Sequence, residues 1–391
     1  MAKSLALISG LAAFCASCAA EVPLQAPPAT TIPAAVAPAT GEVVDPEAVD
    51  PEAEQFLQRM VAEEHLSGVV LIRRHGVVVH KRAYGEAAPG RPNRVDGRFH
   101  IASMTKQFTA AAIMRLAEQG KLRLDETINE FLPPRYRSAR WSAVTVKHLL
   151  SHSSGIPDYA ETRDYYDVTD GRAFGATVDG MIREAMQAPL QFEPGSRFRY
   201  SNIGYTLLGQ IIEQQSGRGY ADYIETELLD PMGMRDSAVH DAEYVASPRD
   251  AEGMRWDAAS GRQVHDDIVS LPVTAPDGGL ITTLDDFARW IVVYRDMAHP
   301  RLSRGSIVQM SRQSAPNEHY HWPQQGFRGE AYYGLGLMRS GDLVMHEGYV
   351  VGFRSYFIYS RRDDLLIVLF TNTTSNDVFR IASGLFELQT R

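Results

Sequence analysis

A serine and a lysine stand three residues apart in the stretch FHIASMTKQFTAAAIMRLAEQGKL, residues 99–122. The pattern predicts a helix over about residues 102–119, and side chains three apart on a helix share a face, so the Lys106 amine can reach the Ser103 hydroxyl. Of the five lysines in the chain, Lys106 alone has a serine three residues before it. The spacing indicates a nucleophile near the positive end of a helix dipole, with its base. The alternative is an ordinary serine at a helix start and a solvated lysine.

A lysine that accepts a proton must be neutral, and lowering its pKa from about 10.4 to 7 costs roughly 4–5 kcal/mol. A tyrosine that shares the proton reduces this cost, because the two groups then titrate as a coupled pair. Tyr200-Ser201-Asn202 is the only Tyr-x-Asn in the chain, and it directly precedes an apolar helical run. The same residues also fit a plain helix cap, with Ser201 or Asn202 holding the first turn.

A third candidate lies in the stretch LVMHEGYVVGFRSYFIY, residues 343–359, which predicts two strands. Alternation along a strand places His346 and Gly348 on one face and Glu347 on the other. A glycine there lets a substrate backbone approach closely, and His346 is suited to hold a substrate carboxylate. The alternative is a structural histidine.

The elements that would position these residues come from both ends of the chain. Two β-branched runs around His75-Gly76, in SGVVLIRRHGVVVHKRAYGEA, predict a hairpin after a short helix near Glu54. From Tyr332 onwards, four strand-like stretches precede a final helix, DVFRIASGLFELQ. Residues 125–300 are mostly helical in pattern. This order predicts one antiparallel sheet made from both chain ends, with a helical region inserted between them.

The N-terminal segment precedes this domain. Residues 1–20 have the layout of a secretory signal peptide, with an apolar run too short to span a bilayer. Residues 21–53 are rich in Pro and Ala and predict a disordered linker to a domain over residues 54–391. Both cysteines, Cys15 and Cys18, lie in the first segment. We expect an exported protein, either periplasmic after cleavage near Ala19 or Ala20, or a lipoprotein anchored to the membrane through Cys18.

Composition and motifs exclude several classes of protein. The net charge is -9 and no Lys/Arg-rich run occurs, which excludes the electrostatic footprint of a nucleic-acid binder. His148 and His152 have the four-residue spacing of metal ligands on a helix, but no His-Glu-x-x-His pattern accompanies them, so we expect no metal. The sequence HYH at 319–321 lies in a predicted loop. No Gly-x-Ser-x-Gly elbow is present, so esterase activity would have to come from Ser103.

The three candidate stretches occur together and in a specific order. They resemble the motifs of the serine β-lactamase and penicillin-binding protein superfamily, in its class C-like branch of D-alanyl-D-alanine carboxypeptidases, D-aminopeptidases, class C β-lactamases and related esterases: Ser103-x-x-Lys106, Tyr200-x-Asn202 and His346-x-Gly348. The resemblance spans about residues 54–388 and includes VKHLLSHSSGIPDY and PDGGLITTLDDFARW. It implies an α+β, β-lactamase/transpeptidase-like fold whose sheet is flanked by the terminal helices.

The resemblance also implies catalytic roles. Ser103 is the acylated nucleophile, and Lys106 and Tyr200 together take its proton and later pass it to the leaving group. The chemistry is acyl transfer in two half-reactions, for which no metal or organic cofactor is needed.

Substrate-binding roles follow from the same resemblance. Asn202 contacts the substrate amide, and His346 and Gly348 line the strand beside it. The oxyanion hole consists of the backbone N–H groups of Ser103 and Tyr349, the latter directly after Gly348. The partner is therefore a small-molecule or peptide substrate.

One departure from the family pattern bears on the substrate. Class C β-lactamases usually carry Lys-Thr-Gly in the third motif, and this chain has no lysine after Lys147. A histidine is mostly neutral at pH 7 and is a weaker carboxylate anchor than lysine. We therefore expect an exported serine hydrolase that cleaves a small amide, a D-amino-acid peptide as in a D-alanyl-D-alanine carboxypeptidase. The alternatives are a carboxylesterase on short acyl esters, or a weak β-lactamase or penicillin-binding module without turnover.

Overall fold

The structure is a computed structural model of the 391-residue chain. It describes residues 48–158, 177–266, 275–312, 314 and 331–391. The predicted signal peptide, most of the predicted linker and the sequence HYH at 319–321 lie outside the described residues. Within the described residues, no helix combines the length and the hydrophobicity needed to cross a bilayer.

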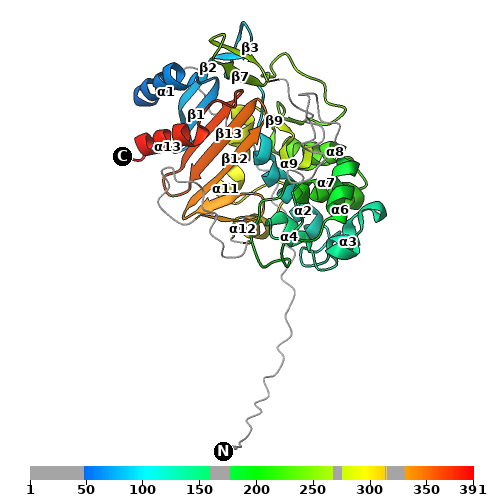
Figure 1. Cartoon of the computed structure of the whole chain (residues 1–391). Helices are drawn as coiled ribbons and strands as arrows, with labels where there is room; N and C mark the ends of the chain where they lie inside the picture. The colour runs from blue at the N-terminus through cyan, green and yellow to red at the C-terminus, as the bar shows by residue number, and fades with distance from the viewer. Residues whose placement is uncertain (1–47, 159–176, 267–274, 313, 315–330) are drawn as a thin grey trace, which may run out of the picture. The chain divides into compact units, whose positions relative to one another are not determined.

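The centre of the domain is an antiparallel sheet of seven strands, in the order β10-β11-β12-β13-β14-β1-β2 (Figure 1). The strand bounds are β1 Gly68–Arg74, β2 Val77–Tyr84, β10 Ala331–Tyr333, β11 Met338–Ser340, β12 Leu343–Val350, β13 Phe353–Ser360 and β14 Leu365–Thr371. Strand β1 pairs with β14 from Gly68 opposite Thr371 to Arg74 opposite Leu365. The predicted sheet built from both chain ends is thus confirmed.

The predicted hairpin at His75-Gly76 joins β1 to β2. Both turn residues have positive φ, 51° at His75 and 79° at Gly76. Two central residues with positive φ are typical of the type I′ turn, whose twist matches that of the flanking strands. The turn therefore sets the pairing of Arg74 with Val77 and of Arg73 with Val78, and a bulge between Arg73 and Ile72 shifts the register of the remaining pairs.

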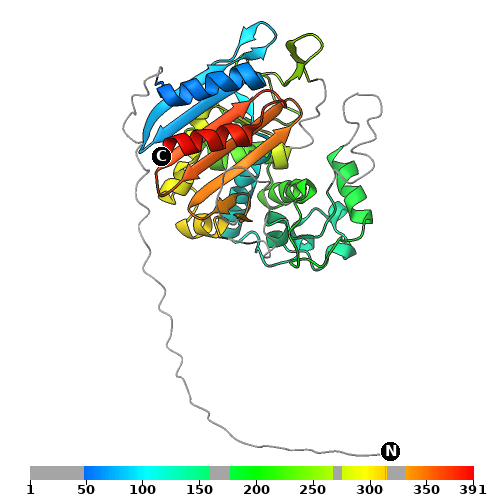
Figure 2. The same cartoon turned by 60° about the vertical axis from the view of Figure 1, so that its left-hand side comes forward.

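Helices cover both faces of the sheet. The terminal helices α1 (Pro51–Glu64) and α13 (Val378–Gln389) lie side by side across one face (Figure 2). Helix α1 begins three residues before the predicted Glu54, because Asp50 caps it by accepting from the Ala53 amide at 2.8 Å.

Strand β14 is buried on both sides. Its alternate side chains point to opposite faces, with Ile367 packing beneath the terminal helices and Val368 packing against the helical region. This two-sided burial explains why β14 is an unbroken apolar run.

The inserted region is mostly helical, as predicted. Its helices and helical turns are η1 Ala102–Thr105, α2 Lys106–Glu118, α3 Ile128–Phe131, η2 Pro134–Tyr136, η3 Ala139–Trp141, α4 Val146–Leu150, α6 Val178–Gln187, α7 Asn202–Ser216, α8 Tyr220–Ile224, the π-helical turn η5 Glu225–Leu229, η6 Asp230–Met232, α9 Ala275–Gly278, α10 Leu284–Trp290, α11 Val292–Asp296 and α12 Arg304–Met310. The helix predicted over residues 102–119 thus begins as a 3₁₀ turn and continues as α2.

Short strands also occur beside these helices, which the sequence pattern did not predict. They are β3 Glu86–Ala88, β4 Arg91–Pro92, β5 Phe99–His100, β6 Ala238–Val239, β7 Met254–Asp257, β8 Arg262–His265 and β9 Leu280–Thr282. Each is too short to show a period of two in the sequence. One pair of them positions the site, because β5 and β9 bond to each other and hold the residues that lead into η1.

Candidate active site

The 3₁₀ turn η1 presents Ser103 at the start of α2. The preceding residue, Ala102, is buried and has a left-handed φ of 45°, a strained conformation for a residue with a side chain. The backbone of Ile101, directly before Ala102, is fixed by two hydrogen bonds. Its amide donates to Leu280 O at 3.0 Å, and its carbonyl oxygen accepts from Ser355 Oγ at 2.8 Å. Ser103, which follows this kink, is half-buried, whereas its neighbours Ala102 and Met104 are buried.

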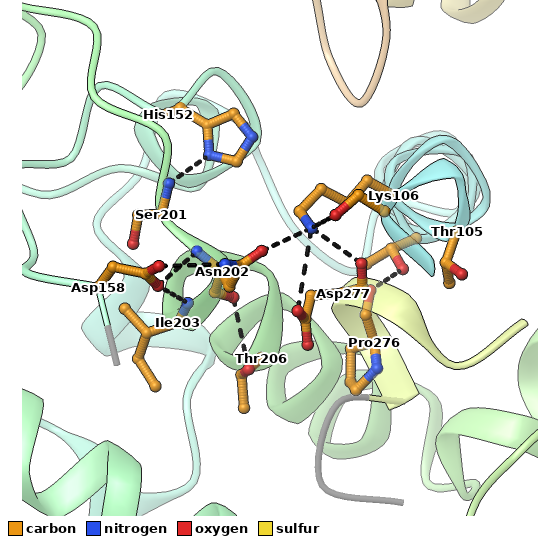
Figure 3. A network of polar contacts seen from close by, with 12 residues as sticks. Thr105, Lys106, His152, Asp158, Ser201, Asn202, Ile203, Thr206, Pro276 and Asp277 are labelled. Atoms are coloured by element: carbon orange, nitrogen blue, oxygen red, sulfur yellow. Dashed lines mark hydrogen bonds and ion pairs between the residues drawn. The ribbon is translucent and has the colours of Figure 1, made fainter. Parts of the chain in front are cut away.

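Lys106 lies one turn further along and is fully buried. Its Nζ has three oxygen partners: Ser103 Oγ at 2.9 Å, Asn202 Oδ1 at 2.8 Å and the main-chain oxygen of Asp277 at 2.8 Å (Figure 3). An ammonium can donate to all three. A neutral amine can donate to Asn202 and Asp277 while its lone pair faces the Ser103 hydroxyl. The arrangement therefore suits a lysine that alternates between the two protonation states.

The charges around Lys106 set its affinity for a proton. Burial away from water lowers the pKa of Lys106 to about 8, against the nearby carboxylates of Asp277, Asp158 and Glu347, which raise it. The nearest carboxylate oxygen is Asp277 Oδ2, 3.9 Å from Nζ. A lysine with this pKa is partly neutral near pH 8, which is what a general base requires.

Tyr200 lies against the same ammonium. The Nζ atom of Lys106 is 4.9 Å from the centroid of the Tyr200 ring and 5.4 Å from that of Tyr205. His152 stacks on Tyr200 with ring centroids 4.1 Å apart, and its Nδ1 accepts from the Ser201 amide at 3.1 Å. His152 thus fixes both the ring and the backbone of the Tyr200 segment. Since burial holds the pKa of His152 well below its usual value, it does so as a neutral group.

Asn202 begins helix α7, and the carboxylate of Asp158, 44 residues earlier in the sequence, holds it in place. Asp158 Oδ1 accepts from the amides of Asn202 and Ile203 at 2.7 and 3.1 Å, and Asp158 Oδ2 accepts from Asn202 Nδ2 at 3.0 Å (Figure 3). Neither Ser201 nor Asn202 caps the helix through its own side chain. Because Asp158 takes the Nδ2 group, the amide oxygen of Asn202 is left facing Lys106.

His346 lies on β12 and is fully buried. Its Nδ1 is 2.6 Å from Glu347 O, a group that only accepts, so Nδ1 carries the proton and Nε2 accepts from Tyr333 Oη at 3.1 Å. Burial lowers the pKa of His346 to about 3. The predicted role as a carboxylate anchor stays a prediction, and it would require this neutral ring to exchange Tyr333 for the substrate.

Gly348 lies on β12 where this strand packs against η1, the turn that carries Ser103. A Cβ atom at this position would stand 2.2 Å from Ile101 O and 2.2 Å from Ser355 Oγ. The sequence predicts that a substrate backbone approaches this glycine, whereas in the structure the backbone of Ile101 does so. Gly348 is therefore required for η1 to pack against β12.

The backbone of Tyr349 faces the open edge of β12. Val350 and Phe353 close a two-residue hairpin, so the backbone groups of Val350 point to β13 and those of Tyr349 point away from it. Among the described strands, β11 covers that other edge only from Leu343 to Met345. The Tyr349 N–H thus points away from β13, beyond the last residue of β12 that pairs with β11, and its role as an oxyanion-hole donor stays a prediction.

The structure brings most of the predicted site residues together. The Lys106 ammonium contacts Ser103, Asn202 and the Tyr200 ring. Gly348 packs against Ile101, two residues before Ser103, and Tyr349 follows Gly348 on the same strand. Sequence reasoning did not single out three residues that hold this group in place, Asp158, Asp277 and Tyr333, and it considered a fourth, His152, only as a metal ligand. Asp158, His152 and Asp277 lie in stretches that resemble the family, VKHLLSHSSGIPDY and PDGGLITTLDDFARW, and this was the only signal for the two aspartates.

The two histidines considered as metal ligands have separate structural contacts. His148 Nδ1 accepts from the Thr145 amide at 3.2 Å in the capping box of α4, whereas His152 bonds to the Ser201 amide. The part of the chain that the structure describes contains no group of three or more His, Cys, Asp or Glu side chains placed to hold a metal ion.

Comparisons with known proteins agree with this geometry. The Beta-lactamase family model matches residues 53–389. Over 239 residues the chain is 32% identical to penicillin-binding protein 4* of Bacillus subtilis (strain 168), covering 59% of this chain and 50% of that protein. Over 201 residues it is 34% identical to esterase EstB of Burkholderia gladioli, covering 48% and 50%. The chain therefore spans about half the length of these two relatives.

A solved structure extends the similarity to most of the chain. The octameric penicillin-binding protein homologue from Pyrococcus abyssi superposes with a TM-score of 0.73 at 31% identity. The similarity covers 86% of this chain and 76% of that one.

Proposed function

Because the chain belongs to the Beta-lactamase family, in its class C-like branch of serine hydrolases, we propose that it cleaves small esters and amides through an acyl-enzyme on Ser103. The observation that carries this proposal is the contact of Lys106 Nζ with Ser103 Oγ at 2.9 Å, made by a fully buried amine. A lysine in this position can take the serine proton near neutral pH.

The first half-reaction forms the acyl-enzyme. Ser103 Oγ attacks the substrate carbonyl while its proton passes to Lys106 Nζ, and the N–H groups of Ser103 and Tyr349 stabilise the oxyanion. The carbonyl then reforms and the bond to the leaving group breaks, and the leaving group takes the proton from Lys106, with Tyr200 as the predicted partner in this transfer. In the second half-reaction a water gives one proton to Lys106 Nζ as its oxygen attacks the acyl carbon. The bond from that carbon to Ser103 Oγ then breaks, the acid product leaves, and Oγ takes the proton back from Lys106.

The charges of the site favour a substrate without a free carboxylate beside the cleaved bond. His346 is neutral, and both its ring nitrogens are already paired. Two carboxylates, those of the buried Asp277 and the half-buried Asp158, act electrostatically on Lys106. A substrate carboxylate would add a third negative charge to this group, which is unfavourable at low dielectric. We therefore place esters and neutral amides ahead of peptides ending in D-alanine.

A D-amino-acid peptide is the second candidate, and a relative favours it. The penicillin-binding protein from Bacillus subtilis is 32% identical over the matched residues, and penicillins and D-alanyl-D-alanine peptides both carry a carboxylate. Slow acylation by a penicillin without turnover would fit this candidate.

Intact-mass spectrometry tests the proposal directly. The purified protein and its Ser103→Ala variant are incubated separately with nitrophenyl butyrate, a D-alanyl-D-alanine tripeptide and a fluorescent penicillin. We expect rapid ester turnover and a transient butyryl adduct that the variant lacks. The variant should fold, because Ser103 caps neither η1 nor α2 and loss of its hydrogen bond with Lys106 should change stability by only about 1 kcal/mol. Retention of the adduct in Ser103→Ala would contradict the assignment of the nucleophile. Peptide cleavage faster than ester cleavage would select the second candidate.

His346→Asn separates the two substrate classes. If His346 only supports Tyr333, ester and peptide turnover should fall by the same factor. If it holds a substrate carboxylate, KM for the peptide should rise much more than KM for the ester. The ratio of the two effects decides between the roles even if the variant is less active overall.

We also propose that the protein is exported, on the basis of the signal-peptide pattern in residues 1–20. Fractionation of producing cells tests this, with [³H]palmitate labelling of the Cys18→Ser variant to separate a lipid anchor from a soluble periplasmic protein. Label retained by the variant would exclude Cys18 as the anchor.

A further inference from the structure

Asp277 lies in α9, far from Lys106 in sequence but next to it in space. Residue 277 is 3% exposed. The segment is held by contacts that do not involve the Asp277 side chain: Thr109 Oγ1 donates to Pro276 O at 2.6 Å, and Pro276 packs so closely on α7 that a Cβ at Gly209 would stand 2.3 Å from its Cγ. The backbone position of Asp277 is thus fixed from two helices.

Asp277 acts on Lys106 in two separable ways. Its main-chain oxygen accepts from Nζ at 2.8 Å, and its carboxylate oxygen Oδ2 lies 3.9 Å from the same atom (Figure 3). A change of the side chain alters the second interaction and leaves the first. Asp277→Asn therefore removes one negative charge from the site at nearly constant shape.

Other ionisable groups also face Lys106, from every element packed around it. They are Asp158 and His152 on the segment after α4, Tyr200 just before α7, Tyr205 in the first turn of α7, and His346 and Glu347 on β12. The two histidines are neutral because burial depresses their pKa values. Burial raises the pKa of Glu347 to about 8, so this carboxyl is largely uncharged at pH 7. Asp277 supplies the carboxylate closest to Nζ.

We propose that Asp277 is a positioning residue whose carboxylate keeps Lys106 basic enough to take the proton of Ser103. An amine without water around it loses affinity for protons, and a fixed negative charge at 3.9 Å restores part of that affinity. In the acylation step the proton moves from Ser103 Oγ to Lys106 Nζ as the bond from Oγ to the acyl carbon forms. Asp277 stays ionised throughout and takes no proton. The inference rests on the proposed acyl-enzyme function.

A direct titration of Lys106 tests the inference without reference to activity. The chain has only five lysines, so ¹³Cε signals of labelled lysine are few, and Lys106→Arg assigns the one of interest. We expect the pKa of Lys106 to fall by about one unit or more in Asp277→Asn, roughly a tenfold change in proton affinity. The matched control is Asp285→Asn, which removes a carboxylate that binds Lys81. It should leave the Lys106 signal unchanged and alter that of Lys81.

The rate of serine labelling supplies the functional readout. With a fluorophosphonate probe, the acid limb of the pH–rate profile should move to lower pH in Asp277→Asn and the plateau should fall, because a weaker base transfers the proton less well. A reduced rate with an unchanged Lys106 titration would overturn the inference and leave a purely structural role. If Asp277→Asn does not fold, as judged by its circular dichroism, Asp277→Ser is titrated in its place.

The two proposals fail in different ways. If the probe does not label Ser103 in the wild-type protein, the proposed function is wrong, whereas the shift of the Lys106 titration in Asp277→Asn still supports the electrostatic role. If Ser103 is labelled and the titration does not move, the function stands and the role of Asp277 is wrong.

Discussion

Two buried lysines of this protein are each paired with an aspartate, but in different ways. Lys81 on β2 is 6% exposed, and its Nζ lies 2.7 Å from both carboxylate oxygens of Asp285. Lys106 is 0% exposed, its close partners are neutral oxygens, and the carboxylate of Asp277 stands off at 3.9 Å. The Asp285 side chain is 44% exposed and that of Asp277 is 5% exposed.

The difference shows how a lysine is made into a base. Lys81 Nζ donates to two carboxylate oxygens at hydrogen-bond distance, and water can solvate the far side of Asp285. Neutral acceptors around Lys106 stabilise both of its protonation states, because an amine can donate to them as well as an ammonium can. Both lysines have an aspartate nearby, so its presence does not distinguish the two sites. They differ in the oxygens closest to Nζ, which are carboxylate oxygens at Lys81 and neutral oxygens at Lys106.

Replacing each lysine by arginine should give the largest contrast. Arginine stays protonated, so Lys106→Arg removes the base and should reduce ester turnover by about 10³-fold or more. Lys81→Arg keeps a cation beside Asp285 and should change turnover by less than about threefold. Steady-state kinetics of the two variants measure this. Turnover near the wild-type rate in Lys106→Arg would mean that another group accepts the proton.

The stability of the protein should depend on pH through Lys106. At a pH below about 8 both folded and unfolded chains hold the proton, and the cost of burying the ammonium is fully present. Between pH 8 and 10.5 the folded protein releases the proton first, so the free energy of unfolding should rise with pH. The gain for one group is about 1.4 kcal/mol per pH unit, or about 3 kcal/mol over the range.

Urea unfolding at a series of pH values within this range measures the slope. Lys106→Arg should lose it, while Lys81→Arg should retain it. Equal slopes in the wild-type protein and Lys106→Arg would mean that Lys106 titrates normally and that the contrast between the two sites is wrong.

The rate of catalysis should follow the neutral form of Lys106. Since the pKa of Lys106 is about 8, kcat/KM should reach a plateau above that pH and fall about tenfold per unit well below it, to about 1% of the plateau at pH 6. The Lys81→Arg variant should show the same limb. Ester kinetics in constant-ionic-strength buffers test this, and a flat profile over the same range would exclude Lys106 as the base.

Asp158 should matter less than Lys106, because it acts through Asn202. In Asp158→Asn the new amide nitrogen faces Asn202 Nδ2, so two donors meet and the amide oxygen of Asn202 turns away from Lys106. We expect kcat to fall on the order of tenfold. Asp179→Asn is the control, since Asp179 bonds only to Tyr136 and Arg183 among the described contacts. Equal effects of the two variants would argue against the positioning of Asn202.

The smallest effect is expected for removal of the Lys81 charge. Lys81→Met breaks the ion pair with Asp285, but that carboxylate is exposed enough to be solvated again, so the loss of stability should stay below about 1 kcal/mol. Thermal unfolding at pH 7 measures it. A loss of several kcal/mol would mean that this pair is as strongly coupled as the group around Lys106.

Local patterns in the sequence predicted the parts of this structure that depend on near neighbours. The hairpin at His75-Gly76 follows from its turn residues, and the contact of Ser103 with Lys106 follows from helical spacing. The contacts of Asp158 and Asp277 do not. Folding brings Asp158 to Asn202 across a separation of 44 residues and Asp277 to Lys106 across 171. No periodicity in a single sequence reports such pairs.

A bend within a predicted strand shows the same limit. The stretch YYGLGLMR predicts a single strand, but it forms β10 and β11 with a turn between them, in which the Gly334 amide donates to Leu337 O at 2.9 Å. This turn brings Tyr333 back beside His346. The buried state of His346 therefore depends on a reversal of the chain that alternation alone does not reveal.

The pairing of β1 with β14 has a consequence for how the chain is made. Val69 of β1 lies opposite Phe370 of β14, so the two strands are synthesised about 300 residues apart. Until Thr371 has left the ribosome, the apolar edge of β1 has no partner strand on that side and is exposed to aggregation. Such long-range pairing slows folding. The sheet therefore cannot close before β14 has been synthesised.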